Sequence, residues 1–167
     1  EKLKAKYAPP PSQFLDVNGL SVHYRDEGKG FPIVLIHGTS SSLHTWDAWT
    51  KELVKKYRVI RMDIPAFGLT GPSEERDYSP TAYVRFLDDF LNKINIRKFH
   101  LAGNSLGGLI AWNYALAHPQ KVEKLVLIDA AGYPFRKMPL IFRLTKIAPF
   151  AFFGKYITPR FLISKNL

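Results

Sequence analysis

The sequence contains no cysteine, and this absence excludes disulfides, thiolate nucleophiles and metal sites with cysteine ligands. It also lacks an apolar run long enough to span a bilayer and the pattern of a secretory signal peptide. The first residue is Glu1 and not Met, so we expect a trimmed or processed piece. The compartment stays undetermined; a cytoplasmic protein is favoured, with a membrane-associated parent protein as the alternative.

Acidic residues are missing from one end of the chain. The net charge is +10, but residues 134–167 hold seven Lys and Arg residues and no Asp or Glu. The other 133 residues therefore carry only +3. Because the excess charge belongs to one tail, and no nucleic-acid-binding motif is present, we do not expect a nucleic acid partner. Nothing in the sequence calls for a metal or a cofactor.

Short apolar runs alternate with segments of helical spacing. Residues 1–11 read as a polar lead-in that ends in a stiff, extended triproline spacer. Asn18-Gly19 separates two alternating runs and predicts a hairpin. The expected strands are 12–17, 20–27, 32–37, 58–63, 98–103 and 124–130, and the expected helices are 43–57, 81–94 and 106–117. This order predicts an α/β fold with a doubly wound, mostly parallel sheet.

The stretch Gly103-Asn104-Ser105-Leu106-Gly107 fits the pattern G-x-S-x-G between a predicted strand and a predicted helix. Such a turn holds the Ser in a strained conformation, and the flanking glycines let the neighbouring backbone pass. The hydroxyl then projects at a helix N-terminus, where free N–H groups favour a developing oxyanion. The competing interpretation is a glycine-rich turn that only packs a helix against its strand.

A second loop follows the buried strand 32–37. Gly38 would let the backbone approach the site, and the N–H of Thr39 could join that of Leu106 as an oxyanion donor. We interpret the His37 side chain as a structural residue that ties down this loop. Asn104 and Trp46, with Gly38, are candidates for the substrate pocket.

The segments "HGTSSSLHTW", "RMDIPAFGLTGPS", "GNSLGG", "HP" at 118–119 and "LVLIDAAG" are similar to the α/β-hydrolase family over about residues 15–132. The sequence resembles its bacterial serine esterases and carbon–carbon bond hydrolases in particular. Ser105 stands where the dehalogenase and epoxide-hydrolase branches have an Asp, which argues against both. Relatives commonly have Gly where this chain has Ala66.

In that family the triad runs Ser, acid, His along the chain, so the His should follow the last strand. Four of the five histidines precede Ser105, and His118 lies about 20 Å along the predicted helix from it. None can be the family's base. Asp129 is a candidate acid, although an Asp there is also common as a loop residue, and Asp63 more readily caps its loop.

The resemblance therefore implies the nucleophile half of a site without the base, and a sheet without its last strands. We expect a second polypeptide to complete both: the C-terminal part of the same protein, or a swapped copy. A truncated, inactive fragment is the alternative.

Residues 134–167 fall where relatives insert a lid, so the division expected is lead-in 1–11, hydrolase core 12–133 and the start of a helical cap at 134–167. Apolar residues there at helical spacing could line an acyl or aromatic pocket. A lid with a solvated basic face is a second interpretation. A membrane-surface helix is a third that we do not favour.

The prediction is a serine hydrolase acting on a small or medium carboxylic ester. The alternatives are a carbon–carbon bond hydrolase of the same fold and a non-catalytic ligand-binding protein on the same scaffold.

Overall fold

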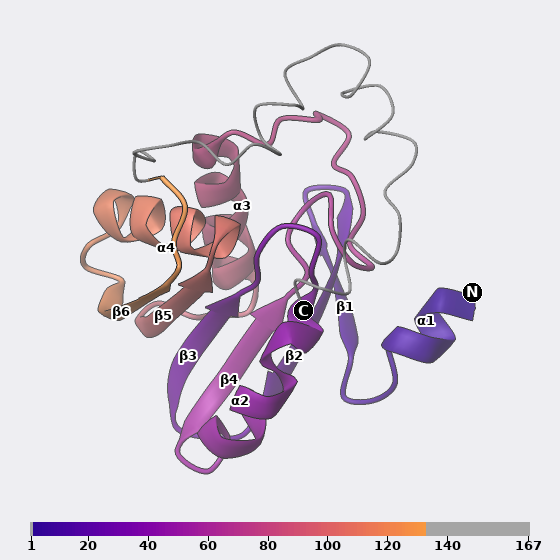
Figure 1. The fold of residues 1–167 in the computed structure, drawn as a ribbon, viewed down its shortest axis with the longest axis horizontal. Helices are drawn as coiled ribbons and strands as arrows, with labels where there is room; N and C mark the ends of the chain where they lie inside the picture. The colour runs from indigo at the N-terminus through magenta and orange to yellow at the C-terminus, as the bar shows by residue number, and fades with distance from the viewer. Residues whose placement is uncertain (1, 133–167) are drawn as a thin grey trace. The chain divides into compact units, whose positions relative to one another are not determined.

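A six-stranded sheet organises residues 2–132, which are the part of the chain that the computed structural model describes (Figure 1). The strands are β1 (Gln13–Val17), β2 (Leu20–Glu27), β3 (Phe31–Ile36), β4 (Tyr57–Met62), β5 (Phe99–Asn104) and β6 (Val122–Ile128). Their order is β1-β2-β4-β3-β5-β6. The pairs β1–β2 and β2–β4 are antiparallel, and the pairs from β4 to β6 are parallel. The predicted mostly parallel sheet is confirmed.

The hairpin forms where Asn18-Gly19 predicted it. Asn18 has φ 53° and Gly19 has φ 84°, so both residues take the left-handed conformation that a two-residue turn requires. The turn sets the register of β1 on β2, with Val17 opposite Leu20.

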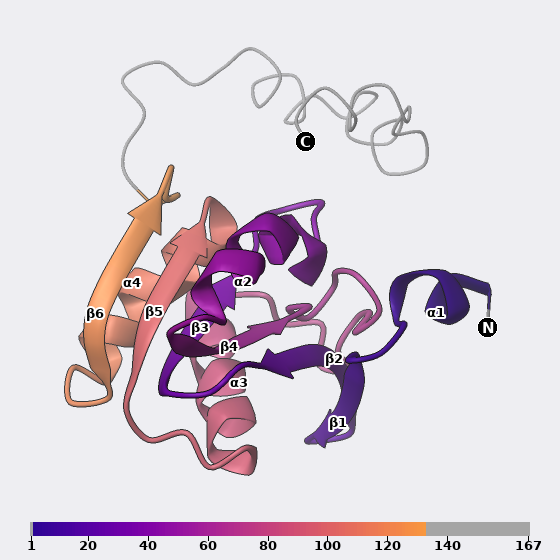
Figure 2. The same cartoon turned by 90° about the horizontal axis from the view of Figure 1, so that it is seen from below.

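Helices cover both faces of the sheet: α3 (Pro80–Lys93) and α4 (Leu106–Ala117) on one, and the short 3₁₀ helix η1 (Leu43–Trp46) with α2 (Asp47–Leu53) on the other (Figures 1 and 2). The central strand β3 shows why both faces need cover. Val34 and Ile36 belong to the core cluster under α3 and α4, while Ile33 and Leu35 belong to the cluster under α2. A strand buried on both faces reads as the continuous apolar run that the sequence shows.

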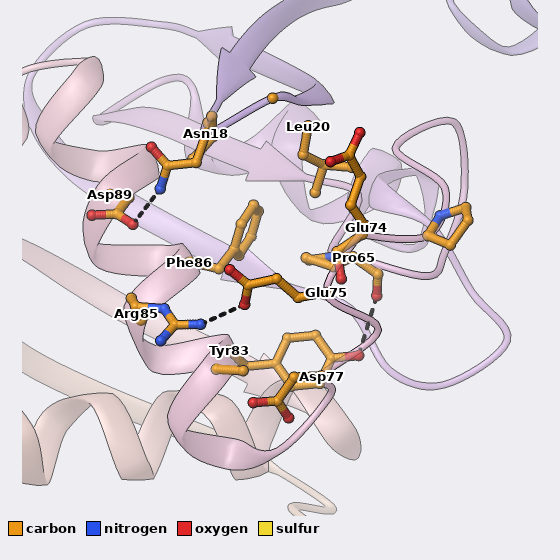
Figure 3. A pocket seen from close by; sticks show the side chains of 15 residues that line it. Asn18, Leu20, Pro65, Glu74, Glu75, Asp77, Tyr83, Arg85, Phe86 and Asp89 are labelled. Atoms are coloured by element: carbon orange, nitrogen blue, oxygen red, sulfur yellow. Dashed lines mark hydrogen bonds and ion pairs between the residues drawn. The ribbon is translucent and has the colours of Figure 1, made fainter.

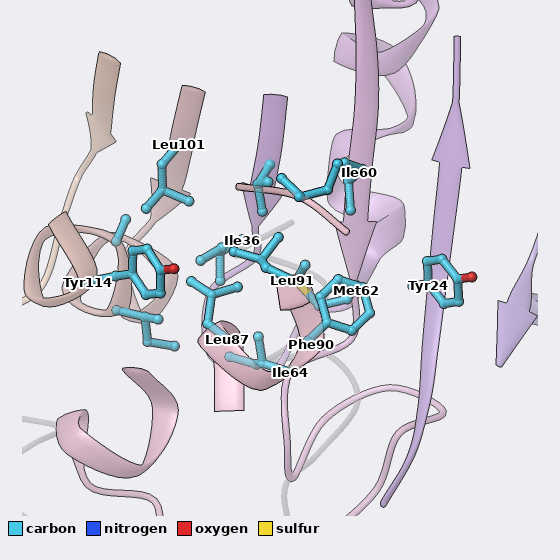
Figure 4. Packing of buried hydrophobic residues seen from close by; sticks show 14 of the residues in the cluster. Tyr24, Ile36, Ile60, Met62, Ile64, Leu87, Phe90, Leu91, Leu101 and Tyr114 are labelled. Carbon is cyan, nitrogen blue, oxygen red and sulfur yellow. The ribbon is translucent and has the colours of Figure 1, made fainter. Parts of the chain in front are cut away.

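The larger cluster packs four buried side chains of α3 against the sheet: Tyr83, Leu87, Phe90 and Leu91. Figure 4 shows the last three of them among the strand residues of this cluster. Ser79 begins this helix by accepting a hydrogen bond from the Ala82 N–H at 3.2 Å, and Pro80 occupies its first turn.

Two predicted segments differ from the structure. Residues Lys2–Tyr7 form a short helix, α1, in the segment that we expected only as a polar lead-in to the triproline spacer. Lys, Leu and Ala favour helix, and the prolines only stop it from continuing. The helix expected at 43–57 is η1 followed by α2, which ends at Leu53. The cap predicted for 134–167 lies outside the described residues. Within residues 2–132, every helix is too short or too polar for a transmembrane span.

The core assignment predicts the effect of truncating Phe90, which is fully buried and meets the ring of Tyr24 edge-on at 5.4 Å. Phe90→Ala should lower the free energy of unfolding by about 3–5 kcal/mol, because the transfer energy is lost and a cavity remains. Urea denaturation measures this. Leu116→Ala, on the 73% exposed side chain of Leu116, is the matched control and should change stability by under about 0.5 kcal/mol. Equal losses in the two variants would contradict this assignment.

Candidate active site

Ser105 is the single residue between β5 and α4. Its backbone angles are φ 52° and ψ −113°, a conformation that costs a non-glycine residue roughly 1–3 kcal/mol. Hydrogen bonds of its own backbone hold it there. Its N–H donates to the Ile128 carbonyl at 3.0 Å, and its carbonyl accepts from the N–H groups of Leu109 and Ala131, both at 3.0 Å. The turn is therefore fixed between the end of β6 and the first turn of α4.

The hydroxyl of Ser105 is left for other partners, since it caps no N–H of α4. The residue is half-buried and stands at the N-terminus of a twelve-residue helix. The backbone N–H groups of the first helical turn have no partner inside the helix and carry its positive dipole end.

Gly107 and Gly103 allow the close approach that this turn requires. A Cβ on Gly107 would overlap the carbonyl oxygen of Ile36, and a Cβ on Gly103 would overlap the carbonyl of Gly107. The first turn of α4 thus lies directly against the end of β3.

The loop after β3 meets the same turn from the other side. A Cβ on Gly38 would lie 3.0 Å from Asn104 Oδ1 and 3.1 Å from the Cβ of Ser105. The structure therefore brings Gly38, Asn104 and Ser105 together. Thr39 and Leu106, the predicted oxyanion donors, are the residues next to Gly38 and Ser105 in the chain. The Asn104 amide also donates to the Ile128 carbonyl at 3.3 Å, which links the turn to β6.

His37 holds the loop from inside the protein. It is fully buried, its Nδ1–H donates to the Gly38 carbonyl at 2.8 Å, and its Nε2 accepts the Ile64 N–H at 3.2 Å. Burial lowers the pKa of this imidazole, although the Gly38 carbonyl and the charge of Asp63 oppose the shift. Both nitrogens are used in the neutral ring, so the structural role predicted for His37 is confirmed.

Asp63 fixes the neighbouring loop and does not face Ser105 as a free acid. Its carboxylate accepts from His23 Nδ1 at 2.8 Å, the Leu43 N–H at 2.7 Å and the Leu69 N–H at 2.8 Å. Burial alone would raise the pKa of this carboxyl, but the three hydrogen bonds and the His23 ring hold it below its usual value. The other ring nitrogen of His23 accepts from the Ser12 hydroxyl at 2.9 Å.

The remaining histidines are excluded as the base by their hydrogen bonds or by their position. His44 bonds the carboxylate of Asp47 at 3.0 Å and a carbonyl at the end of α1 at 2.8 Å. His100 lies five residues before Ser105 on β5, about 16 Å away along the strand. His118 follows the far end of α4. None of the five histidines of the sequence, all within residues 2–132, is placed to take a proton from Ser105.

Two other predicted site residues have the following positions. Asp129 is exposed, one residue beyond β6, in the loop whose Ala131 N–H bonds the Ser105 carbonyl. The indole of Trp46 was expected in the substrate pocket, but the structure packs it in the core with Ile33 and Leu35, where it is 2% exposed. The turn of η1 directs this apolar ring inward. Its N–H has no partner among the described residues.

A hollow of about 320 Å³ lies apart from this site, between the β1–β2 turn and α3 (Figure 3). Two pairs of its polar groups bond each other: Arg85 pairs with Glu75 at 2.8 Å, and Asn18 donates to Asp89 at 2.8 Å. None of the predicted site residues lines it. Among residues 2–132, no group of three or more His, Asp or Glu side chains is placed to hold a metal ion.

Comparison with known proteins gives the context of this geometry. The sequence model of a family described as the alpha/beta hydrolase fold matches residues 32–162. An uncharacterized protein of Mycobacterium tuberculosis is 34% identical over 140 residues, which cover 84% of this chain and 40% of that protein. The 2-hydroxymuconate semialdehyde hydrolase of a Pseudomonas species is 35% identical over 120 residues, covering 70% of this chain and 42% of the enzyme.

Among solved structures, a membrane phospholipase A, described as a bacterial virulence factor, superposes with a TM-score of 0.76 at 30% identity. It matches 82% of this chain and 45% of its own length. A meta-cleavage product hydrolase from Pseudomonas fluorescens has a TM-score of 0.71 at 30% identity, covering 82% and 55%. The chain thus spans about two fifths to a little over half of the length of these proteins.

The close contacts at the turn predict that Gly107→Ala prevents stable folding or lowers the free energy of unfolding by about 3 kcal/mol or more. The added methyl would have to displace backbone carbonyls, which cannot give way as a side chain can. Gly71→Ala is the control, since Gly71 has φ 71° but nothing within 4 Å of an added Cβ, and it should cost only about 1 kcal/mol. Chemical denaturation compares them, and a fully stable Gly107→Ala would rule out this packing.

The lowered pKa of Asp63 predicts a pH-dependent contribution to stability. The unfolded chain binds its proton near pH 4 and the folded chain only at lower pH, so the stabilisation is complete above about pH 4 and is lost as pH falls through the folded pKa. Asp63→Asn should destabilise by about 2–4 kcal/mol at pH 7, because the amide leaves buried donors unpaired. Urea denaturation from pH 7 to pH 3 should show the difference between the two proteins shrinking. A constant difference would refute the ionised carboxylate.

Proposed function

The chain belongs to the alpha/beta hydrolase family, and on this premise we propose that Ser105 is the nucleophile of a serine hydrolase acting on small or medium carboxylic esters. The observation that carries the proposal is the strained φ of 52° at Ser105, held by three backbone hydrogen bonds at a helix N-terminus. Strain maintained in this way is expected where a side chain has to be presented for chemistry.

The proposed reaction has two steps, acylation of Ser105 and hydrolysis of the acyl enzyme. The Ser105 oxygen attacks the ester carbonyl carbon while a His base takes its proton, and the carbonyl π electrons move to the oxygen. The N–H groups of Thr39 and Leu106 stabilise that oxyanion. The C–O bond to the alcohol then breaks, the His returns the proton to the leaving alkoxide, and an acyl ester on Ser105 remains. Water, deprotonated by the same His, releases the acid and restores Ser105.

The base has to come from outside the five histidines of these 167 residues. Each of them lies at the wrong end of its element or has its ring nitrogens engaged, as for His37 and His23. We propose that a further segment of the protein or a second polypeptide supplies it, and Asp129 remains the candidate acid. The exposure of β6 supports this: Leu125, Val126 and Leu127 are 39%, 43% and 37% exposed, which suits a strand that another segment covers.

Ester chemistry is favoured by the phospholipase A among the solved neighbours. Hydrolysis of a carbon–carbon bond beside a ketone is the second candidate, and a specific observation favours it. Asn104 directly precedes Ser105 and its Oδ1 faces Gly38, in a chain 35% identical to 2-hydroxymuconate semialdehyde hydrolase. Both reactions need an oxyanion site, and they differ in whether oxygen or carbon leaves.

A fluorophosphonate probe, read out by intact mass, tests Ser105 and the missing base together. The isolated 167-residue chain should form almost no adduct, because an unassisted hydroxyl is a weak nucleophile. Added imidazole should replace the absent base and increase labelling by about tenfold or more, by comparison with the 10²–10⁴-fold effect of a positioned base. Ser105→Ala should abolish that gain, while Ser41→Ala, a nearby loop variant, should keep it.

Adduct on Ser105 without imidazole would show that a base lies within this chain. An imidazole-dependent adduct that survives in Ser105→Ala would assign the nucleophile to another residue. Absence of any adduct even with added imidazole, from a chain shown to be folded by circular dichroism, would refute the role of Ser105.

A further inference from the structure

The N-terminal helix and the start of β1 expose cations and large apolar side chains on one surface, which we call the α1 surface. Three of the large exposed apolar side chains of residues 2–132 fall here: Leu3 at 65%, Tyr7 at 40% and Phe14 at 40% exposure. Its cations are Lys2, Lys4 and Lys6, and no Asp or Glu occurs between Lys2 and Leu15.

The charges and the rings of the α1 surface are interleaved. The Lys4 ammonium lies 4.5 Å from the centre of the Phe14 ring, and the Lys6 ammonium lies 5.0 Å from the centre of the Tyr7 ring. The positive charges and the apolar side chains therefore lie next to one another on the α1 surface and are not separated onto opposite faces of the helix.

Contacts with the rest of the protein hold this surface in position. His44 Nε2 donates to the Tyr7 carbonyl at 2.8 Å, and the Arg25 guanidinium donates to the Pro9 carbonyl at 3.3 Å. The Phe14 ring stacks on the His23 imidazole at 5.1 Å. A tethered surface of this kind binds a partner without first having to become ordered.

A groove of about 240 Å³ opens between α1 and the loops after β3 and β4, and Leu3, Tyr7 and Leu69 line it. The polar groups at its wall, His23, His44 and Asp63, already hydrogen bond with the protein. The groove therefore presents ring faces and alkyl groups, and an acyl chain is an occupant of matching chemistry.

We infer that the α1 surface binds anionic lipid bilayers. Lysines at a bilayer interface are attracted to anionic headgroups, and Leu, Tyr and Phe side chains are stabilised at the boundary between headgroups and acyl chains. Single-stranded nucleic acid could stack on Tyr7 and Phe14, but the most exposed apolar residue of the α1 surface, Leu3, has no ring for a base to stack on. An anionic bilayer, in contrast, would interact with both the lysines and the apolar side chains of the α1 surface.

The absence of cysteine makes a site-specific test possible in the full chain. Leu3→Cys, labelled with an environment-sensitive fluorophore, should shift its emission to the blue with vesicles of phosphatidylcholine and phosphatidylglycerol, and far less with phosphatidylcholine alone. Leu116→Cys is the matched control, because Leu116 is 73% exposed on α4 and Figures 1 and 2 place α4 on the side of the sheet away from α1. Its label should not respond.

Charge is tested by two triple variants with the same net charge. Lys2→Gln, Lys4→Gln and Lys6→Gln together should weaken vesicle binding by about 100-fold at low salt, from the usual contribution of a lysine near an anionic membrane. The second variant replaces Lys29, Lys51 and Lys56, three exposed lysines on other segments, with Gln as well. It should change vesicle binding by less than about threefold.

Several results would overturn the inference. The first two are an unshifted emission of the Leu3 label and an equal emission shift of the label at position 116. Equal losses of vesicle binding in the two triple variants would assign the binding to net charge and the basic tail. A larger response of the Leu3 label to an oligonucleotide than to anionic vesicles would also contradict the inference. A shift that depends on protein concentration without vesicles would assign the surface to a second copy of the chain.

Discussion

The contact between the first turn of α4 and the end of β3 is the constraint on which the rest of the site depends. A helix that starts one residue after its strand has to pass the neighbouring strand at backbone distance, and only a glycine at position 107 leaves that space. With the helix in this position, Ser105 adopts a backbone conformation with positive φ, and Gly38 lies against the same turn. The strain at Ser105 is maintained because two strands, one helix and one loop all determine its position.

The loops at this edge of the sheet are held by buried polar groups whose hydrogen bonds are complete. His37 connects the loop after β3 to Ile64, and Asp63 connects β4 to Leu43, Leu69 and His23. His37 and Asp63 belong to sequence motifs that suggest catalysis. Their hydrogen-bond donors and acceptors are nevertheless already used in contacts within the fold. These hydrogen-bonded loops hold the edge of the sheet at which Ser105 lies. Because the same hydrogen bonds engage both ring nitrogens of His23 and of His37, neither is available as a base.

Patterns with a single physical cause could be predicted from the sequence. The doubly buried strands, the turn at Asn18-Gly19 and the strand-to-helix turn at Ser105 each follow from local residue types, and all are where they were expected. Features that depend on tertiary contacts could not be predicted. The helix at Lys2–Tyr7 is too short for a periodic pattern, and Trp46 is buried because η1 turns toward the sheet. The partner of His23 is 40 residues away, and no local signal marks it.

The distribution of charge separates two roles along the chain. Between residues 7 and 133, Lys and Arg outnumber Asp and Glu by only one, so the sheet and its helices are nearly neutral. The excess positive charge belongs to the N-terminal lysines and to residues 134–167. A nearly neutral body leaves the field around Ser105 to local dipoles, above all the N-terminus of α4, and under the proposed function this dipole would stabilise the oxyanion. If the α1 surface binds anionic bilayers as proposed, the attraction depends on lysines of α1, so salt can screen it without altering the turn at Ser105.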